Sequence, residues 1–118
     1  MLELGNTARL AGNPARASEA YLAARQRFAG SGTAASAAFQ LGRIAFDGAR
    51  DYGAARRWFS AYLAEQPGGG LAQEALGRVM ETEHRSGDRA AAQASARRYL
   101  ARFPNGAHAA LAQSLVAE

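Results

Sequence analysis

Apolar residues recur every three or four positions through most of the chain, and short polar breaks separate these stretches. This spacing predicts amphipathic helices, because residues three and four apart share one face of a helix. The clearest stretch is 39–70, where two such helices are joined by a short polar turn and stopped by Pro67 and three glycines. The same layout recurs at a constant offset of 37 residues, which indicates an internal repeat. The matching positions are Tyr62-Leu63 with Tyr99-Leu100, and Pro67 with Pro104.

Capping and helix-breaking residues lie between the apolar stretches. Asparagine and aspartate accept hydrogen bonds from the free N–H groups at a helix start, and proline fits the first helical position. Asn13-Pro14, Asp51 and Asp88 are therefore predicted to start helices, and Thr33 is predicted to cap another. The expected helices cover about residues 1–11, 14–29, 34–47, 52–65, 71–86, 89–103 and 107–117.

The apolar positions of each helix are predicted to face inward. They are Ala17, Ala20, Tyr21, Ala24 and Phe28; Ala38, Leu41 and Ala45; Tyr52, Ala55, Phe59, Tyr62 and Leu63; Ala72, Ala75, Leu76, Val79 and Met80; Ala92, Ala96, Tyr99, Leu100 and Phe103; and Leu111, Leu115 and Val116. Gly42 and Gly77 occupy equivalent places, where a missing side chain lets a neighbouring helix come close. Trp58 is assigned to the core or its rim, with a partner contact as the alternative.

Composition narrows the fold class to all-α. Apolar residues make up 48% of the 118 residues, but alanine supplies much of this share, and strand-favouring valine and isoleucine are limited to Ile44, Val79 and Val116. The length fits one domain, and the absence of cysteine excludes disulfides while leaving the compartment open. No apolar run approaches the roughly 18 residues that cross a bilayer, so we expect no transmembrane segment. The N-terminus MLELGN lacks the basic and apolar regions of a signal peptide, so we expect none.

Three successive helix pairs of about 34 to 38 residues are typical of helical solenoids, in which each pair buries its apolar face on the next. The chain resembles tetratricopeptide repeats at three sets of residues. They are Leu4-Gly5, Gly12-Asn13, Ala17, Tyr21 and Ala24; Leu41-Gly42, Asp51-Tyr52, Ala55, Phe59 and Pro67; and Leu76-Gly77, Gly87-Asp88, Ala92, Ala96 and Pro104. The second and third pairs carry extra residues before the inter-helix turn, so longer helices or turns are expected there.

The resemblance implies an all-α, right-handed superhelix of three helix pairs plus a C-terminal end helix. The single domain would span 1–118, with repeats at about 1–32, 33–70 and 71–106 and the end helix at 107–118. Because the chain begins and ends in mid-repeat, we expect it to be a fragment of a longer protein. The tails YLAEQPGGGLAQEAL and YLARFPNGAHAALAQ are similar to those of bacterial envelope repeat proteins, which favours a periplasmic or envelope location, with a cytoplasmic location as the alternative.

The resemblance also implies protein or peptide binding rather than catalysis, with no cofactor, and places a concave groove along the first helix of each pair. The groove-facing candidates are Asn6, Arg9, Ser36, Phe39, Arg43, Phe46, Glu74, Arg78 and Glu81. Arg43 and Arg78 follow the paired glycines, so together they could clamp a carboxylate of an acidic peptide. The alternative is that each arginine pairs with Asp47 or Glu74 inside the scaffold. The lysines and second asparagine of the family's chaperone-binding clamp are missing.

The sequence gives weaker support for metal binding and for phosphate binding. His84 follows Glu81 by three residues, but a metal site needs three or four ligands, and His108 is expected only to touch the surface. The glycine-rich loops 30–33 and 67–70 lack the strand and lysine of a phosphate-binding loop. Two alternatives to groove binding are self-assembly through the repeat ends and electrostatic binding of nucleic acid or an anionic surface. The second alternative rests on the net charge of +4 and on the arginine pairs 56–57 and 97–98.

Overall fold

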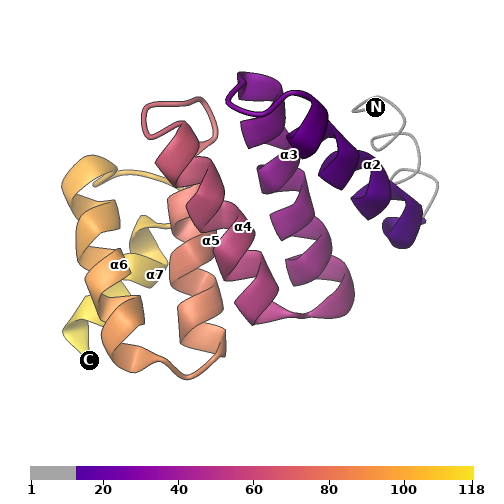
Figure 1. Ribbon diagram of the computed structural model, residues 1–118. Helices are drawn as coiled ribbons and strands as arrows, with labels where there is room; N and C mark the ends of the chain where they lie inside the picture. The colour runs from indigo at the N-terminus through magenta and orange to yellow at the C-terminus, as the bar shows by residue number, and fades with distance from the viewer. Residues whose placement is uncertain (1–12) are drawn as a thin grey trace.

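The computed structural model describes residues 13–118, and Figure 1 shows their helices following one another in chain order from α2 to α6 and α7. The elements are α2 (Pro14–Arg27), α3 (Gly32–Arg43), the π-helical segment η1 (Ile44–Ala49), α4 (Tyr52–Glu65), α5 (Ala72–Arg85), α6 (Arg89–Arg102) and α7 (Ala109–Ala117). Over residues 13–118 the chain is all-helical and contains no strand, as its composition predicts. The helix expected at 1–11 lies outside the described residues.

Side-chain caps fix most of the helix starts where the sequence places them. The carboxylate of Asp51 accepts a hydrogen bond from the N–H of Ala54 at 3.0 Å, and that of Asp88 accepts one from Ala91 at 3.2 Å. Asn13 caps α2 in the same way, with Pro14 at the first helical position. The predicted cap at Thr33 is wrong. Helix α3 begins one residue after Ser31, whose hydroxyl accepts the hydrogen bond from the N–H of Ala34 at 3.2 Å.

The end of the α3 segment differs from the continuous helix expected at 34–47. The α-helix ends at Arg43, and the chain continues as a wider π-helical turn from Ile44 to Ala49. This turn ends at Arg50, which has a left-handed backbone with φ of 52°, and the N–H of Asp51 then bonds the carbonyl of Ala45 at 2.9 Å. A π turn holds more residues than an α turn. The segment before Asp51 is therefore accommodated by widening the helix end.

Consecutive helices pack against each other along the whole described chain, in a repeat-like order from α2 to α7. Three apolar clusters hold this arrangement together, because each cluster draws residues from successive helices. Tyr21 and Leu41 belong to the cluster joining α2 and α3, Phe59 to the cluster spanning α3, α4 and α5, and Tyr99 and Leu115 to the cluster spanning α5, α6 and α7. Stability therefore comes from a row of small cores rather than from one central core.

Two turns, after α4 and after α6, have the same structure. Each begins with a tyrosine whose buried hydroxyl accepts a backbone N–H nine residues later: Tyr62 from Leu71 at 3.0 Å, and Tyr99 from His108 at 2.9 Å. A side chain at Gly69 or Gly106 would collide with that hydroxyl. The shared Tyr-Leu, proline and glycine pattern of the two tails therefore encodes one turn that fixes where the next helix starts.

Most inward-facing predictions are confirmed, with one exception, and one surface prediction is wrong. Phe28 is 40% exposed because it follows the last residue of α2, beyond the face that packs on α3. His108 turns inward rather than staying on the surface, and its ring lies against Gly77 of α5. Trp58 is half-buried against the α2–α3 cluster, which agrees with the rim position. None of the described helices is long and apolar enough to cross a membrane.

Candidate functional site

The predicted groove residues do not form one exposed surface. Asn6 and Arg9 lie outside the described residues, while Ser36 and Arg43 are half-buried. Phe39 is 3% exposed, because its ring packs edge-to-face on Phe59 and on Tyr62. Its predicted place on an open groove is thus corrected to a place in the core.

Phe46 and Arg78 are engaged with the scaffold. Phe46 is buried, with the guanidinium groups of Arg78 and Arg85 at 5.0 and 5.5 Å from its ring centre. Arg78 donates hydrogen bonds to Glu74 at 2.9 Å and to Asp47 at 3.3 Å. Burial acts to lower the pKa of Arg78, but these two carboxylates outweigh it and raise the pKa above its ordinary value. The scaffold-pairing alternative therefore describes Arg78.

Arg43 and Glu81 complete the set of candidates. Arg43 lines a small pocket of about 170 Å³ together with Asp47, but makes no hydrogen bond or ion pair with another described residue. Glu81 accepts hydrogen bonds from Arg85, one turn further along α5. The structure thus does not join Arg43 and Arg78 into a free pair of cations, and a ligand role for these residues stays a prediction.

Glu74 is held by a partner that the sequence did not suggest. Its carboxylate lies 2.9 Å from Nε2 of His108, and it also accepts the hydrogen bond from Arg78. Burial acts to raise the pKa of Glu74, but the hydrogen bonds to His108 and Arg78 outweigh burial and leave the pKa below its ordinary value. Glu74 therefore connects α5 to the start of α7 through its contact with His108.

Charge is sorted between the two sets of helices. The helices that are second in the predicted pairs, α2, α4 and α6, carry nine arginines and two glutamates, a net charge of +7. The first helices, α3 with η1, α5 and α7, carry three arginines and four acidic residues, a net charge of −1. We call the exposed surface of α2, α4 and α6 the second-helix face. Its basic character was hidden in the sequence, where the charges alternate helix by helix.

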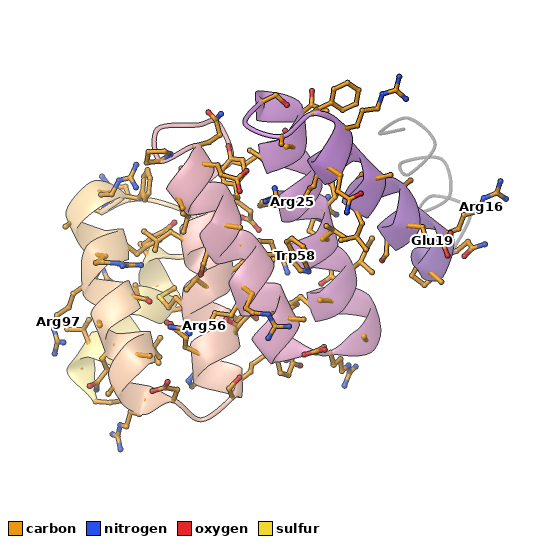
Figure 2. All side chains as sticks on the ribbon, in the orientation of Figure 1. Arg16, Glu19, Arg25, Arg56, Trp58 and Arg97 are labelled. Atoms are coloured by element: carbon orange, nitrogen blue, oxygen red, sulfur yellow. The ribbon has the colours of Figure 1, made fainter. Side chains whose placement is uncertain are left out.

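Several arginines of this face have no acidic partner. Among residues 13–118, the arginines that make no ion pair are Arg16, Arg27, Arg43, Arg50, Arg57, Arg97, Arg98 and Arg102, and six of these eight lie on second helices. Figure 2 shows Arg97 at the outer edge of the molecule, directed away from the helices. The second-helix face therefore presents cations that are available to an acidic partner.

A cleft of about 490 Å³ opens on this face between α4 and α6, with α5 as its floor. Arg56 and Ser60 line it from α4, Arg98 and Ala94 from α6, and Glu83 from α5. One arginine of each adjacent pair lines the cleft, Arg56 of the pair 56–57 and Arg98 of the pair 97–98. We call it the α4–α6 cleft.

A buried carboxylate organises the floor of this cleft. Glu83 is only 3% exposed, and it accepts hydrogen bonds from Nε of Arg56 at 2.8 Å and from the hydroxyl of Ser95 at 2.6 Å. A buried charge is stable only when it is paired and hydrogen-bonded, so Arg56 is tethered by this contact. The terminal nitrogens of Arg56 make no hydrogen bond to another described residue and remain free as donors.

Sequence reasoning missed Glu83 and Ser95. Glu83 continues the apolar stripe of Leu76, Val79 and Met80 at helical spacing, and an acidic residue in such a stripe is a signal for a buried, paired charge. Ser95 gave no local signal, because its role depends on Glu83 from another helix. His84 is exposed, and no group of three or more potential metal ligands occurs among the described residues.

Comparisons with known proteins add no relative to this picture. No protein-family model matches the chain, and no curated protein matches it.

Proposed function

We propose that this chain is a helical-repeat interaction module of the tetratricopeptide kind, a right-handed superhelix of three helix pairs with an end helix. We propose further that its partner is an acidic segment of another protein, bound on the second-helix face. The observation that supports this most directly is the charge sorting, with +7 on the second helices against −1 on the first.

Support for the repeat class comes from the turns after α4 and α6. Their helix ends have nearly identical backbones, with φ and ψ of −137° and 66° at Gln66 and of −133° and 62° at Phe103. The residues before the next helices, Leu71 and His108, agree as closely. Equal turns at a fixed interval are what a solenoid needs, because each pair must present the same surface to the next.

The second-helix face is a better candidate surface than the predicted groove. In the groove, Phe39 and Phe46 are buried and Arg78 is already paired with two carboxylates. An acidic ligand would have to displace Asp47 and Glu74 before it could use that guanidinium. On the second-helix face, Arg57, Arg97 and Arg98 have no such competitor among the described residues.

The proposal can be tested with a fluorescein-labelled octaglutamate peptide and an octaglutamine peptide of equal length, titrated by fluorescence anisotropy. We expect the chain to bind octaglutamate and not octaglutamine, with an affinity that falls as salt is raised. The double substitution Arg57→Glu with Arg97→Glu should weaken binding by more than about tenfold, because it reverses two unpaired charges of the face.

The matched control is Arg43→Glu with Arg50→Glu, which makes the same change in net charge outside the second helices. It should weaken binding only about two- to threefold, through the long-range field. Equal losses for the two double variants, or no binding of octaglutamate, would remove the assignment to the second-helix face. Tighter binding of a labelled octathymidylate, with the same dependence on Arg57 and Arg97, would favour the nucleic-acid alternative instead.

A further inference from the structure

Two gaps separate the second helices, one between α2 and α4 and one between α4 and α6, and they differ in how far side chains fill them. Between α2 and α4, Trp58 lies under the guanidinium of Arg25 at 5.5 Å, and Arg25 forms a two-armed ion pair with Glu65 at 2.7 and 3.1 Å. In Figure 2, Trp58 and Arg25 lie on the side of α4 toward α2, and Arg56 lies on the side toward α6. The first gap is therefore occupied by the protein's own side chains.

Between α4 and α6 the equivalent positions carry small residues. The 37-residue offset places Ser95 where the first gap has Trp58, and Ala94 at the repeat position of Arg57. The hydroxymethyl group of Ser95 replaces the indole of Trp58, and the cleft of about 490 Å³ lies beside this smaller side chain. The cavity thus follows from a substitution pattern within the repeat.

The cleft that results is lined by hydrogen-bond donors. Arg98 lines it from α6, and Ser60 lines it from α4 with its hydroxyl group. Arg56 uses only its Nε to bond Glu83, so its terminal nitrogens are available as donors. Glu83 does not repel an anion at full strength, because Arg56 and Ser95 already satisfy its two oxygens. The second guanidinium, that of Arg98, has no acidic partner among residues 13–118 and leaves the cleft with an excess positive charge.

The geometry points to a binding site for a carboxylate side chain of an acidic partner in the α4–α6 cleft, with Arg98 and Arg56 as the hydrogen-bond donors. This site rests on the proposed function and gives it an anchor point. A guanidinium offers two parallel N–H groups that match the two oxygens of a carboxylate. Arg56 is held in place before the ligand arrives, so less side-chain freedom is lost on binding.

A protein ligand fits this cleft better than a nucleic acid does. None of the residues that line it is aromatic, so a base would have no ring on which to stack. The cleft is also bounded by α4, α5 and α6, which suits the insertion of one side chain rather than the passage of a phosphate backbone. The occupant is therefore an aspartate or glutamate side chain that anchors a longer acidic segment.

The experiment compares neighbouring residues that carry the same charge. Arg98→Gln and Arg97→Gln each remove one positive charge from the same helix turn, but only Arg98 lines the cleft. With labelled octaglutamate as the probe, Arg98→Gln should weaken binding about tenfold, because it removes charge-assisted hydrogen bonds. Arg97→Gln should weaken binding by no more than about twofold, as expected for an exposed charge. Circular dichroism of both variants checks that the helices are intact.

A steric pair tests the cleft without changing any charge. Ala94→Leu narrows the cleft, whereas Ala90→Leu adds the same atoms on an exposed position of α6 that does not line it. We expect Ala94→Leu to weaken octaglutamate binding about fivefold or more and Ala90→Leu to leave it unchanged.

If octaglutamate binds the wild type but Arg98→Gln matches Arg97→Gln, or Ala94→Leu has no effect, the cleft site is overturned while the second-helix face survives. If octaglutamate does not bind at all, the proposed function itself fails. If labelled octathymidylate binds with the same dependence on Arg98, the site recognises phosphodiesters and the carboxylate assignment is overturned.

Discussion

The places where three helices meet can be compared directly, because the repeat builds the same backbone twice. At the first joint, where α3, α4 and α5 meet, Phe39 and Leu71 lie beside Tyr62 in an apolar cluster. At the second joint, where α5, α6 and α7 meet, the corresponding residues are Glu74 and His108, which bond to each other at 2.9 Å beside Tyr99. The offsets are 35 residues along the first helices and 37 residues across the turns.

The difference teaches that the tyrosine, rather than the residues around it, defines the joint. Both hydroxyls accept the N–H of the residue that precedes the next helix, although one of these residues is leucine and the other histidine. The first joint is stabilised by burying apolar surface, which is insensitive to pH. The second depends on a partly exposed ion pair and on hydrogen bonds, so it should respond to pH and salt.

The largest expected effect comes from adding a methyl group at the glycine of each joint. An added Cβ at Gly42 would stand 2.8 Å from the ring of Phe59, which is fully buried, whereas at Gly77 it would meet the half-buried ring of His108. Overpacking costs about 1–3 kcal/mol, and better helix propensity returns about 1 kcal/mol. We expect Gly42→Ala to lower the free energy of unfolding by about 2 kcal/mol and Gly77→Ala by about 1 kcal/mol, measured by urea denaturation.

This order follows from which ring can move. Phe59 is enclosed by the first joint, while His108 stands at the start of α7 and can turn outward if it gives up Glu74. Gly48→Ala serves as a control, because an added Cβ there meets no atom. A larger loss for Gly77→Ala than for Gly42→Ala would show that the polar joint is the more rigid of the two.

The tyrosine hydroxyls come next in size. Tyr99 accepts two hydrogen bonds, from the N–H of His108 at 2.9 Å and from the side-chain amide of Gln73 at 3.2 Å. Tyr62 accepts one, from the N–H of Leu71. Each lost bond that leaves a buried donor costs about 1 kcal/mol. Tyr99→Phe should therefore cost about 1.5 kcal/mol and Tyr62→Phe about 1 kcal/mol in thermal unfolding, and equal losses would deny Gln73 a role.

Much of the fold could be predicted from the sequence, because the signals that set helix ends are local. A cap such as Asp51 or Asp88 bonds a residue three positions away, and Pro67 and Pro104 stop helices wherever they occur. The close approach at Gly42 was also predictable, because side-chain absence in an apolar stripe has few other uses. The π turn after Arg43 was not, because nothing local distinguishes it from a longer α-helix.

The candidate site was predicted much less well, because it depends on contacts between helices. Periodicity places Phe39 and Glu74 at equivalent positions, but it does not show that one ring turns into the core while the carboxylate stays at the rim. His108 meets Gly77 across 31 residues, and Glu83 meets Ser95 across a turn. The carboxylate clamp at Arg43 and Arg78 stays a prediction, whereas the basic second-helix face needed the pairing of helices before it could be seen.

A smaller effect is expected where the two repeats enter their second helices. Arg50 and Gly87 are 37 residues apart and both have positive φ, 52° and 79°. In this left-handed region a non-glycine residue lowers the stability of the fold by about 1 kcal/mol or more. Replacing it with glycine recovers only part of this energy, because the unfolded chain gains conformational entropy at a glycine. Arg50→Gly should raise the free energy of unfolding by about 0.7 kcal/mol, and Gly87→Ala should lower it by about 1 kcal/mol in urea titrations. A destabilised Arg50→Gly variant would instead show that the arginine side chain matters to this turn.

The smallest expected effect is a difference between the two joints in how stability depends on pH. The folded pKa of Glu74 lies below its ordinary value of 4.5, so its carboxylate stabilises the fold above that pH, and the contribution disappears as pH falls through the folded pKa. Because Glu74 is more than a third exposed, solvent screening reduces the expected gain to about 0.5 kcal/mol.

Urea unfolding at pH 7 and at pH 3 should therefore show a smaller acid-induced loss in Glu74→Gln than in the wild type. His108→Leu, which gives the second joint the leucine of the first, should reduce the loss in the same direction, because Arg78 alone then holds the carboxylate. Glu65 also has a lowered pKa, through its hydrogen bond with Arg25, so Glu65→Gln must reduce the acid-induced loss independently and additively. If neither Glu74→Gln nor His108→Leu changes the acid-induced loss of unfolding free energy, the polar joint responds to pH as the apolar joint does. The two joints would then be equivalent in stability, with the tyrosine hydrogen bond as their common feature.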